Sequence, residues 1–242
     1  GAGSKWAIVY SVTELYDPAT GEWTDGAELT WGRRSPILAS LPDDTVLAAG
    51  GSDANLEPFD SAEVWDPATD TWSLTGSMKI ARERMAWVSL PDGRVMVIGG
   101  LDTKNFKRLA SVEMYDPATG EWSTVAPMAT ERTLHQAVTL ADGRVLVVGG
   151  GKLDGPHLDS AEVYDPATDA WSDAGTMSVG RVLHTATALS DGRVLVVGGK
   201  GKKTSAELWN PETAIWTSAG DTEDFRSEHV SVLLSDDVPS PK

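Results

Sequence analysis

The sequence predicts an all-β protein, a five-bladed β-propeller with four antiparallel strands in each blade. The main observation is a motif of the form Glu-x-Tyr-Asp-Pro-Ala-Thr-x-x-Trp, which occurs five times with small variations. The copies span residues 14–23, 63–72, 113–122, 162–171 and 207–216. Their Trp residues lie 49, 50, 49 and 45 residues apart, and a period of about 50 residues indicates a repeat architecture. In addition, no segment has the periodicity of an amphipathic helix.

The first two strands of a unit are clearest in residues 132–177. Residues 134–140 form a short apolar run, and Ala141-Asp142-Gly143 follows it. Asp-Gly between two apolar runs favours a hairpin turn. Residues 144–148 are a continuous apolar run that ends at a Gly-Gly pair. We expect this second strand to be buried on both faces, because blades pack face to face.

The third and fourth strands of the unit flank the repeated motif. The third strand is predicted at residues 160–164 and the fourth around Trp171. Between them lies Asp165-Pro166-Ala167-Thr168-Asp169, in which Pro presets φ and the preceding Asp can accept hydrogen bonds from the turn backbone. Four short antiparallel strands, repeated radially, describe a propeller blade.

The count of strands predicts how the array closes. Second strands that end at Gly-Gly occur four times, whereas the other strands occur five times. The first strands are expected to begin near Ser35, Arg84, Leu134, Leu183 and Glu228. Residues 226–234 are a first strand without a following second strand, and residues 6–10 precede a third strand. We expect the C-terminal strand to complete the N-terminal blade, because closure removes exposed sheet edges. A truncated larger propeller is the alternative.

We expect a single domain at residues 5–235, after a cloning remnant at residues 1–4 and before a disordered tail at residues 236–242. The aromatic and glycine positions of this domain resemble the kelch family in its bacterial form. The resemblance rests on the Gly-Gly pairs, on the Trp of each fourth strand and on an aromatic residue in each third strand. These third-strand residues are Tyr16, Trp65, Tyr115, Tyr164 and Trp209. The resemblance implies a propeller that serves binding proteins and enzymes alike.

Composition restricts the function classes. The net charge of -16 argues against nucleic acid as a partner, because no basic field covers the surface. No apolar run approaches the roughly 18 residues of a membrane span, so no membrane partner is expected. The chain has no Cys, which excludes disulfides and Cys nucleophiles. It also excludes the chemistry of kelch-type copper oxidases that resemble galactose oxidase, which need a Tyr–Cys cross-link. We expect a monomer without cofactors. The compartment stays open, and secretion with a removed signal is one possibility.

Strand direction assigns the loops to two faces. The turns with Asp-Gly and Asp-Pro-Ala-Thr share one face, and the loops that differ between repeats share the other, which we call the variable face. It comprises residues 52–60, 101–109, 151–159 and 200–204, together with the loops between blades. Variable loops on a rigid scaffold usually carry binding. Candidate contact residues there are Trp31, Phe59, Phe106 and Phe225. One loop is acidic, with Asp53, Glu57 and Asp60, and two others are basic.

Five arginines recur at the entry to the first strand: Arg33, Arg82, Arg132, Arg181 and Arg226. The innermost strand lines the channel, so we expect the arginines at the channel mouth on the variable face. Guanidinium groups there can donate in bidentate fashion to a carboxylate, sulfate or phosphate. Five glutamates recur on the same face: Glu14, Glu63, Glu113, Glu162 and Glu207. Structural Arg–Glu pairing is therefore the alternative.

Three histidines, His135, His184 and His229, follow these arginines in repeats three to five, where the first two repeats have Pro36 and Met85. Three His ligands suit zinc or copper. A strand position that faces the neighbouring blade also explains them as packing residues, which is the interpretation we favour.

The function favoured is a binding module without catalytic activity, with a protein segment, an anionic glycan or an acidic peptide as the ligand at the arginines and the variable face. The alternative is an enzyme of mutarotase, isomerase or cyclase type that acts on an acidic small molecule at the same channel mouth. Its candidate groups are His135, His184 and Glu162, with the three histidines as a possible metal site. A purely structural propeller is the third hypothesis.

Overall fold

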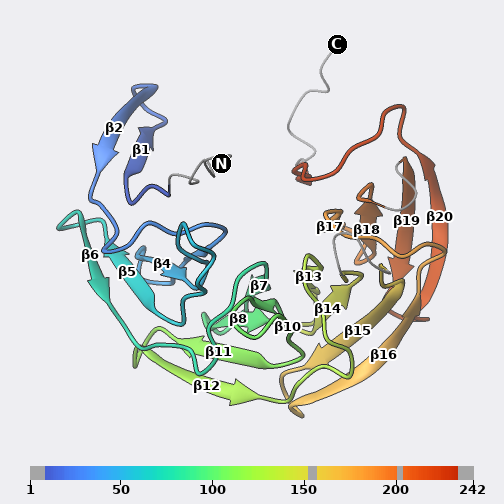
Figure 1. The fold of residues 1–242 in the computed structure, drawn as a ribbon. Coiled ribbons are helices and arrows are strands. Elements are labelled where there is room, and N and C mark those ends of the chain that lie inside the picture. The colour runs from blue at the N-terminus through green and yellow to red at the C-terminus, as the bar shows by residue number, and fades with distance from the viewer. Residues whose placement is uncertain (1–8, 152–156, 201–203, 234–242) are drawn as a thin grey trace, which may run out of the picture. The chain divides into compact units, whose positions relative to one another are not determined.

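The computed structural model describes residues 9–151, 157–200 and 204–233, which form antiparallel strands (Figure 1). The chain divides into two compact units, residues 1–125 and 126–242. Within the described ranges there is no helix, and so none that is long and apolar enough to cross a membrane.

The first unit contains one hairpin and two four-stranded sheets. The hairpin consists of β1 (Thr13–Asp17) and β2 (Glu22–Gly26). The first sheet is β3 (Ile37–Ser40), β4 (Val46–Ala49), β5 (Ala62–Asp66) and β6 (Thr71–Leu74). The second sheet is β7 (Ala86–Ser89), β8 (Val95–Ile98), β11 (Val112–Asp116) and β12 (Glu121–Val125). A short hairpin, β9 (Leu101–Asp102) and β10 (Lys107–Arg108), lies between β8 and β11 in the chain.

The second unit contains two more four-stranded sheets with the same chain-order topology. The third sheet is β13 (Gln136–Thr139), β14 (Val145–Val148), β15 (Ser160–Asp165) and β16 (Ala170–Thr176). The fourth sheet is β17 (Thr185–Ala188), β18 (Val194–Val197), β19 (Ser205–Asn210) and β20 (Ile215–Asp221). The predicted order of four antiparallel strands per repeat is therefore confirmed for these four sheets.

The second strands form the core, as their apolar composition predicts. Every residue of β8 and of β14 is fully buried, because each of these strands is covered by other elements on both faces. The repeated turn also has the predicted chemistry: in the third sheet the Asp165 carboxylate accepts a hydrogen bond of 2.9 Å from the backbone N–H of Ala167. The aromatic residues of the motif pair across the third and fourth strands, and the ring centres of Tyr164 and Trp171 are 5.1 Å apart.

The first strands begin two residues later than predicted. Ser35, Arg84, Leu134 and Leu183 have φ values of 47°, 53°, 56° and 58°. This left-handed conformation cannot continue into a strand. The first strands therefore start at Ile37, Ala86, Gln136 and Thr185.

The two ends of the chain differ from the prediction. The described residues 222–233 contain no strand, although Glu228 has the same left-handed φ, 56°, as its counterparts. Likewise β1 pairs with β2 alone, so its other edge has no strand among the described residues. The predicted remnant (residues 1–4), the tail (residues 236–242) and most of the predicted N-terminal strand lie outside the described residues.

The β1–β2 hairpin leaves its aromatic pair, Tyr16 and Trp23, exposed to solvent. Tyr16 is 52% and Trp23 65% exposed, whereas the equivalent Tyr115 is 2% exposed. The rings of Tyr16 and Trp23 still contact each other, with centres 5.1 Å apart. Local strand pairing therefore suffices for the aromatic contact, and burial requires the rest of a sheet.

Candidate functional site

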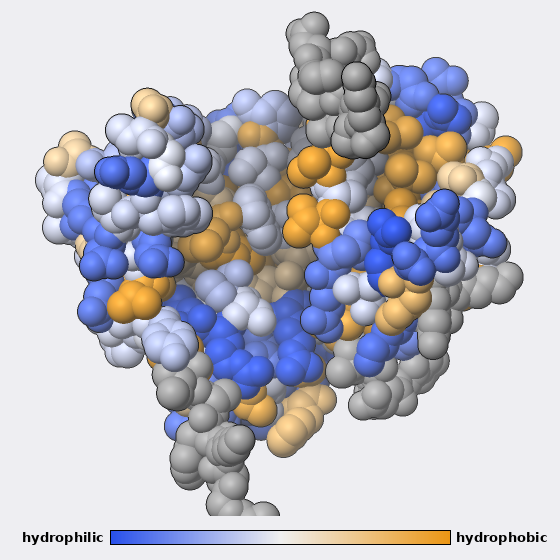
Figure 2. Space-filling view, turned by 90° about the horizontal axis from the view of Figure 1, so that it is seen from above, coloured by the Kyte–Doolittle hydropathy of each residue, from blue (hydrophilic) through white to orange (hydrophobic). Residues whose placement is uncertain are grey.

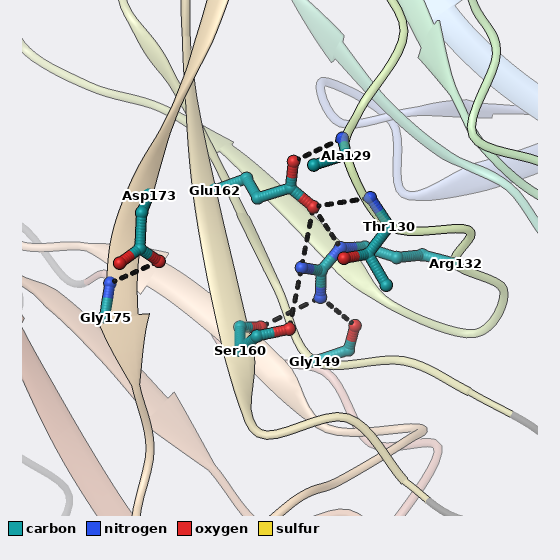
Figure 3. A network of polar contacts seen from close by, with 8 residues as sticks. All are labelled: Ala129, Thr130, Arg132, Gly149, Ser160, Glu162, Asp173 and Gly175. Carbon is teal, nitrogen blue, oxygen red and sulfur yellow. Dashed lines mark hydrogen bonds and ion pairs between the residues drawn. The ribbon is translucent and has the colours of Figure 1, made fainter.

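Each four-stranded sheet contains a buried arginine that joins its strands, and Figure 3 shows the one in the third sheet, Arg132. In the third sheet, Nη1 of Arg132 donates to the carbonyl oxygens of Gly149 and Ser160, both at 2.8 Å. Nη2 donates to the Ser160 hydroxyl and to Oε1 of Glu162, both at 2.9 Å. Arg132 thus connects the end of the second strand with the start of the third.

The paired glutamate fixes the loop that precedes the first strand. Glu162 accepts hydrogen bonds from the backbone N–H groups of Ala129 at 2.7 Å and of Thr130 at 3.2 Å. With the Arg132 guanidinium, these donors satisfy the buried carboxylate on several sides, as a buried charge requires. The network therefore determines the path of the loop between the fourth strand and the next first strand.

The same network occurs in the other three sheets. The ion pairs are Arg33–Glu63 at 2.9 Å, Arg82–Glu113 at 2.5 Å and Arg181–Glu207 at 2.8 Å. All four arginine side chains have no exposed surface. The alternative of structural Arg–Glu pairing thus describes these four repeats. The prediction that the arginines present donors at a channel mouth is corrected for them, because both Nη atoms of each are engaged inside the sheet.

Burial and ion pairing shift the pKa values of the network residues in opposite directions. Burial lowers the pKa of Arg82, and the neighbouring Glu113 partly offsets this. For Glu63, burial raises the pKa, but hydrogen bonds from Thr30 and Arg33 outweigh burial, so that the net pKa is lowered. The carboxylate of Glu63 is therefore held in its charged form.

The fifth arginine and the fifth glutamate differ from the other four pairs. Arg226 and Glu14 are both exposed, and neither makes an ion pair among the residues that the structure describes. Of the predicted arginines, only Arg226 therefore keeps its guanidinium accessible.

The histidine positions pack against the glycine pair of the preceding sheet. A Cβ atom on Gly149, whose φ is +66°, would lie 2.8 Å from Cε1 of His184, so only glycine fits beneath this ring. His229 lies over Gly198 in the same way. In the first unit Met85 lies over Gly50. A thioether and an imidazole thus occupy equivalent positions, which is consistent with the packing interpretation.

His184 is 1% exposed. Burial, and then the charge of Arg181, lowers the pKa of His184 to about 3, so its imidazole is neutral over the usual pH range. His135 is likewise buried. In the parts of the chain that the structure describes, no group of three or more His, Cys, Asp or Glu side chains is placed to hold a metal ion.

Two of the predicted aromatic contact residues come together in the first unit. The ring centres of Trp31 and Phe59 are 6.4 Å apart. The Arg33 guanidinium carbon lies 5.0 Å from the centre of the Phe59 ring, a cation–π contact. Phe59 therefore covers the buried arginine, and Trp31, which is 43% exposed, presents its surface to solvent.

Phe106 lies at the tip of the β9–β10 hairpin and is 89% exposed. Its φ is 51°, and Leu56 in the preceding loop has a φ of 67°. Large residues rarely adopt this conformation, which costs of order 1–3 kcal/mol. The two loops are joined, since the Thr103 hydroxyl donates to the carbonyl oxygen of Leu56 at 2.6 Å. The structure therefore holds an exposed aromatic residue in a strained turn.

The acidic and the basic loop of the first unit meet at a cleft of about 400 Å³. Glu57 and Asp60 line it from the acidic loop, and Lys104 lines it from the hairpin. Lys79, which the sequence analysis did not single out, contributes a second ammonium group. Charges of both signs thus border one hollow. On the surface shown in Figure 2, hydrophobic residues form small groups with hydrophilic residues between them.

The remaining aromatic candidate, Phe225, belongs to the second unit and is 50% exposed. Part of the variable face falls on residues 152–156 and 201–203, which lie outside the described residues. Leu56 and Lys79 were missed because no pattern recurs at their positions in the sequence. The sequence signal for Leu56 is a large apolar residue near Phe59 in a largely polar loop.

Comparison with known proteins agrees with this architecture. The family model described as Kelch motif matches residues 33–79, 88–129 and 132–178, which is more than half of the chain. Among solved structures, one described as "Structure of YjhT" is similar with a TM-score of 0.72 and 14% sequence identity, over 92% of this chain and 86% of that chain. Identity at this level shows a shared fold alone. A comparison with curated proteins gives no match.

Proposed function

Because the chain belongs to the kelch-repeat family, we propose that it is a binding module whose contact surface is the variable face. The observation that carries this proposal is Phe106, an aromatic side chain that is 89% exposed in a left-handed turn. Burying such a side chain in a complex contributes about 1.5–3 kcal/mol. An exposed aromatic residue on a preorganised loop is typical of a contact residue.

The charges around Phe106 favour an acidic protein segment as the ligand. Lys104, Lys107 and Arg108 belong to the same hairpin and outnumber its single carboxylate, Asp102, although the whole chain carries a net charge of -16. A local positive patch on an acidic protein attracts and orients an acidic partner. The apolar ring favours a peptide with a hydrophobic side chain over an anionic glycan. The four buried arginines support the loops and do not take part in contact.

The test is a peptide display library of matched acidic and neutral segments, each with or without a hydrophobic residue, offered to the purified chain. We expect selection of acidic segments that contain a hydrophobic residue. Phe106→Ala should weaken the binding of a selected peptide by about tenfold or more, and Lys107→Glu should weaken acidic peptides selectively.

The matched control is Ile215→Ala, which removes an exposed apolar side chain at the start of β20. This residue follows the repeated turn and should leave peptide binding unchanged. Equal losses in Phe106→Ala and Ile215→Ala, or selection of no segment at all, would show that the variable face is not the contact surface.

We also propose that the protein has five blades and that the C-terminal segment closes the ring of blades. The N–H of Gly199 donates to the carbonyl oxygen of Arg226 at 2.9 Å, as that of Gly150 does to Arg181 at 2.9 Å. The segment that begins at Arg226 thus contacts the fourth sheet in the way that the segment before the first strand of the fourth sheet contacts the third sheet. Arg226 and Glu14 are the two members of the repeated ion pair that lack a partner among the described residues. Pairing of Arg226 with Glu14 would give the N-terminal blade the network of the other four.

A further inference from the structure

The second unit contains a cleft of about 640 Å³ that none of the predicted site residues explains. It lies where the end of β16 and the loop after it face β19 and β20. Thr176, Met177 and Ser178 line one side, and Thr204, Trp216 and Asp221 line the other. None of its described lining residues belongs to the Phe106 hairpin, which is part of the first unit.

Two β-bulges border this cleft. In the third sheet the register shifts after Ser160, which pairs with Thr176, and in the fourth sheet it shifts after Ser205, which pairs with Asp221. Each bulge has a glycine in the left-handed region directly before the cleft residue: Gly175 has a φ of 74° and Gly220 a φ of 85°. Figure 3 shows the first of them, where Gly175 donates to the Asp173 carboxylate at 3.2 Å.

The bulges distinguish these two sheets from the second sheet. There β11 and β12 pair in regular register from Val112 to Asp116, and β12 ends at Val125. The extra residue in β16 and in β20 extends each strand to seven residues. Bulges re-aim side chains and occur preferentially beside functional sites. Here both bulges bring a polar side chain, Thr176 or Asp221, to the same cleft.

The hydrogen-bonding groups of the cleft are only partly used within the chain. The Glu207 carboxylate at its base is occupied by the backbone N–H of Ser178 at 2.8 Å and by Arg181. By contrast, the hydroxyl groups of Thr176 and Ser178 and the carboxylate of Asp221 make no side-chain hydrogen bond with the described residues. Preplaced hydroxyl and carboxylate groups in one cleft can position a ligand that donates and accepts several hydrogen bonds.

The charge of the cleft determines which ligand fits. Among the described residues that line it, Glu207 is paired with Arg181, and Asp221 is the carboxylate without a cation partner, so Asp221 disfavours an anionic ligand. Asp221 accepts hydrogen bonds only, and it therefore favours a ligand with hydroxyl donors. Met177 and Ala206 are buried beneath the cleft, and the partly exposed Trp216 supplies the apolar surface against which the C–H face of a sugar ring can pack. A neutral pyranose combines these properties.

We propose that this cleft, between the two bulged strands of the second unit, is a binding site for a neutral monosaccharide unit. Asp221 accepts hydrogen bonds from ring hydroxyls, Thr176 and Ser178 exchange further ones, and Trp216 contacts the ring. This site is independent of the peptide-binding surface proposed above, because its residues and its ligand class differ.

The test measures the indole N–H signal of Trp216 by nuclear magnetic resonance, assigned through Trp216→Phe. The probes are the methyl glycosides of glucose, galactose and mannose, together with methyl glucuronide and glucosamine as the matched anionic and cationic sugars. We expect at least one neutral glycoside to shift the Trp216 signal in a saturable way. The uronide should bind at least about tenfold more weakly than the matching glucoside, because of repulsion by Asp221.

Asp221→Asn should weaken the neutral glycoside by about tenfold, since one charge-assisted hydrogen bond is lost. Glu223→Gln is the matched control, because it removes the same charge from an exposed residue two positions further on, and it should leave binding unchanged. Thermal melts of both variants check that the fourth sheet is intact. Absence of a saturable shift with every neutral glycoside overturns the proposal. A preference for glucosamine that Asp221→Asn abolishes also overturns it, in favour of an ammonium site.

Discussion

Replacement of Arg132 by Ala should destabilise the fold much more than replacement of a surface arginine. In the structure, Arg132 donates to two carbonyl oxygens, to the Ser160 hydroxyl and to Glu162, and its side chain has no exposed surface. The Ala variant leaves the Glu162 carboxylate buried without its cation. Removal of one partner of a buried ion pair costs about 3–5 kcal/mol, a large share of the roughly 5–15 kcal/mol that stabilises a typical protein.

The matched control is Arg144→Ala. Arg144 also makes an ion pair, with Asp142 at 2.8 Å, but the two side chains are 36% and 51% exposed. An exposed pair of this kind contributes about 0–1 kcal/mol. The sequence gives no reason to expect a larger loss of stability at Arg132 than at Arg144. The comparison therefore tests whether burial in the tertiary structure determines that loss.

The assay is urea denaturation followed by the fluorescence of the ten Trp residues, together with thermal melts. At roughly 2–4 °C per kcal/mol for a protein of this size, Arg132→Ala should lower the melting temperature by about 6–20 °C. Arg132→Lys should recover little, because an ammonium group cannot reproduce the planar fork. If Arg132→Ala destabilises the protein no more than Arg144→Ala does, the buried network does not stabilise the fold more than an exposed ion pair.

Three further predictions concern titration and closure. The lowered pKa of Glu63 means that its stabilising effect is present above the unfolded-state pKa and is lost as the pH falls through the folded-state value; Glu63→Gln should therefore reduce the acid sensitivity measured by pH-dependent melts. The pKa of His184 falls from 6.5 to about 3 on folding, so stability should decline as the pH drops from about 6.5 towards 3, and His184→Met, which introduces the residue found at the equivalent position 85, should remove that decline. For closure, Glu14→Arg and Arg226→Glu should each lower the melting temperature and the double reversal should restore it; additive losses in this double-mutant cycle would exclude the pair.

Much of the fold follows from local sequence signals. Asp-Gly between apolar runs predicted the first hairpin of the second, third and fourth sheets, and Asp-Pro-Ala-Thr predicted the second hairpin of the first, second and third sheets. Both turns depend on the φ preferences and side-chain hydrogen bonds of a few neighbouring residues. The first strands start two residues after the positions near which they were predicted. Leu134 and Leu183 carry no sequence signature of a left-handed conformation, since tertiary contacts impose it.

The candidate site was less predictable. The recurrence of arginine and glutamate indicated a common role, but the choice between ligand binding and internal pairing depends on burial, which a one-dimensional pattern does not contain. The structure decided for pairing at Arg33, Arg82, Arg132 and Arg181. Similarly, the bulges at Gly175 and Gly220 depend on the register between neighbouring strands, and register is set by the whole sheet.

By itself, the sequence determined the repeat, the strand order and the loops in which the repeats differ. These features depend on residue periodicity and on turn chemistry, both of which act over a few residues. Tertiary structure alone decided which polar groups are satisfied inside the protein and which remain accessible, because that depends on residues about 30 positions apart, such as Arg132 and Glu162. The accessible groups, Phe106 on its hairpin and Asp221 in its cleft, are those on which the proposed functions depend.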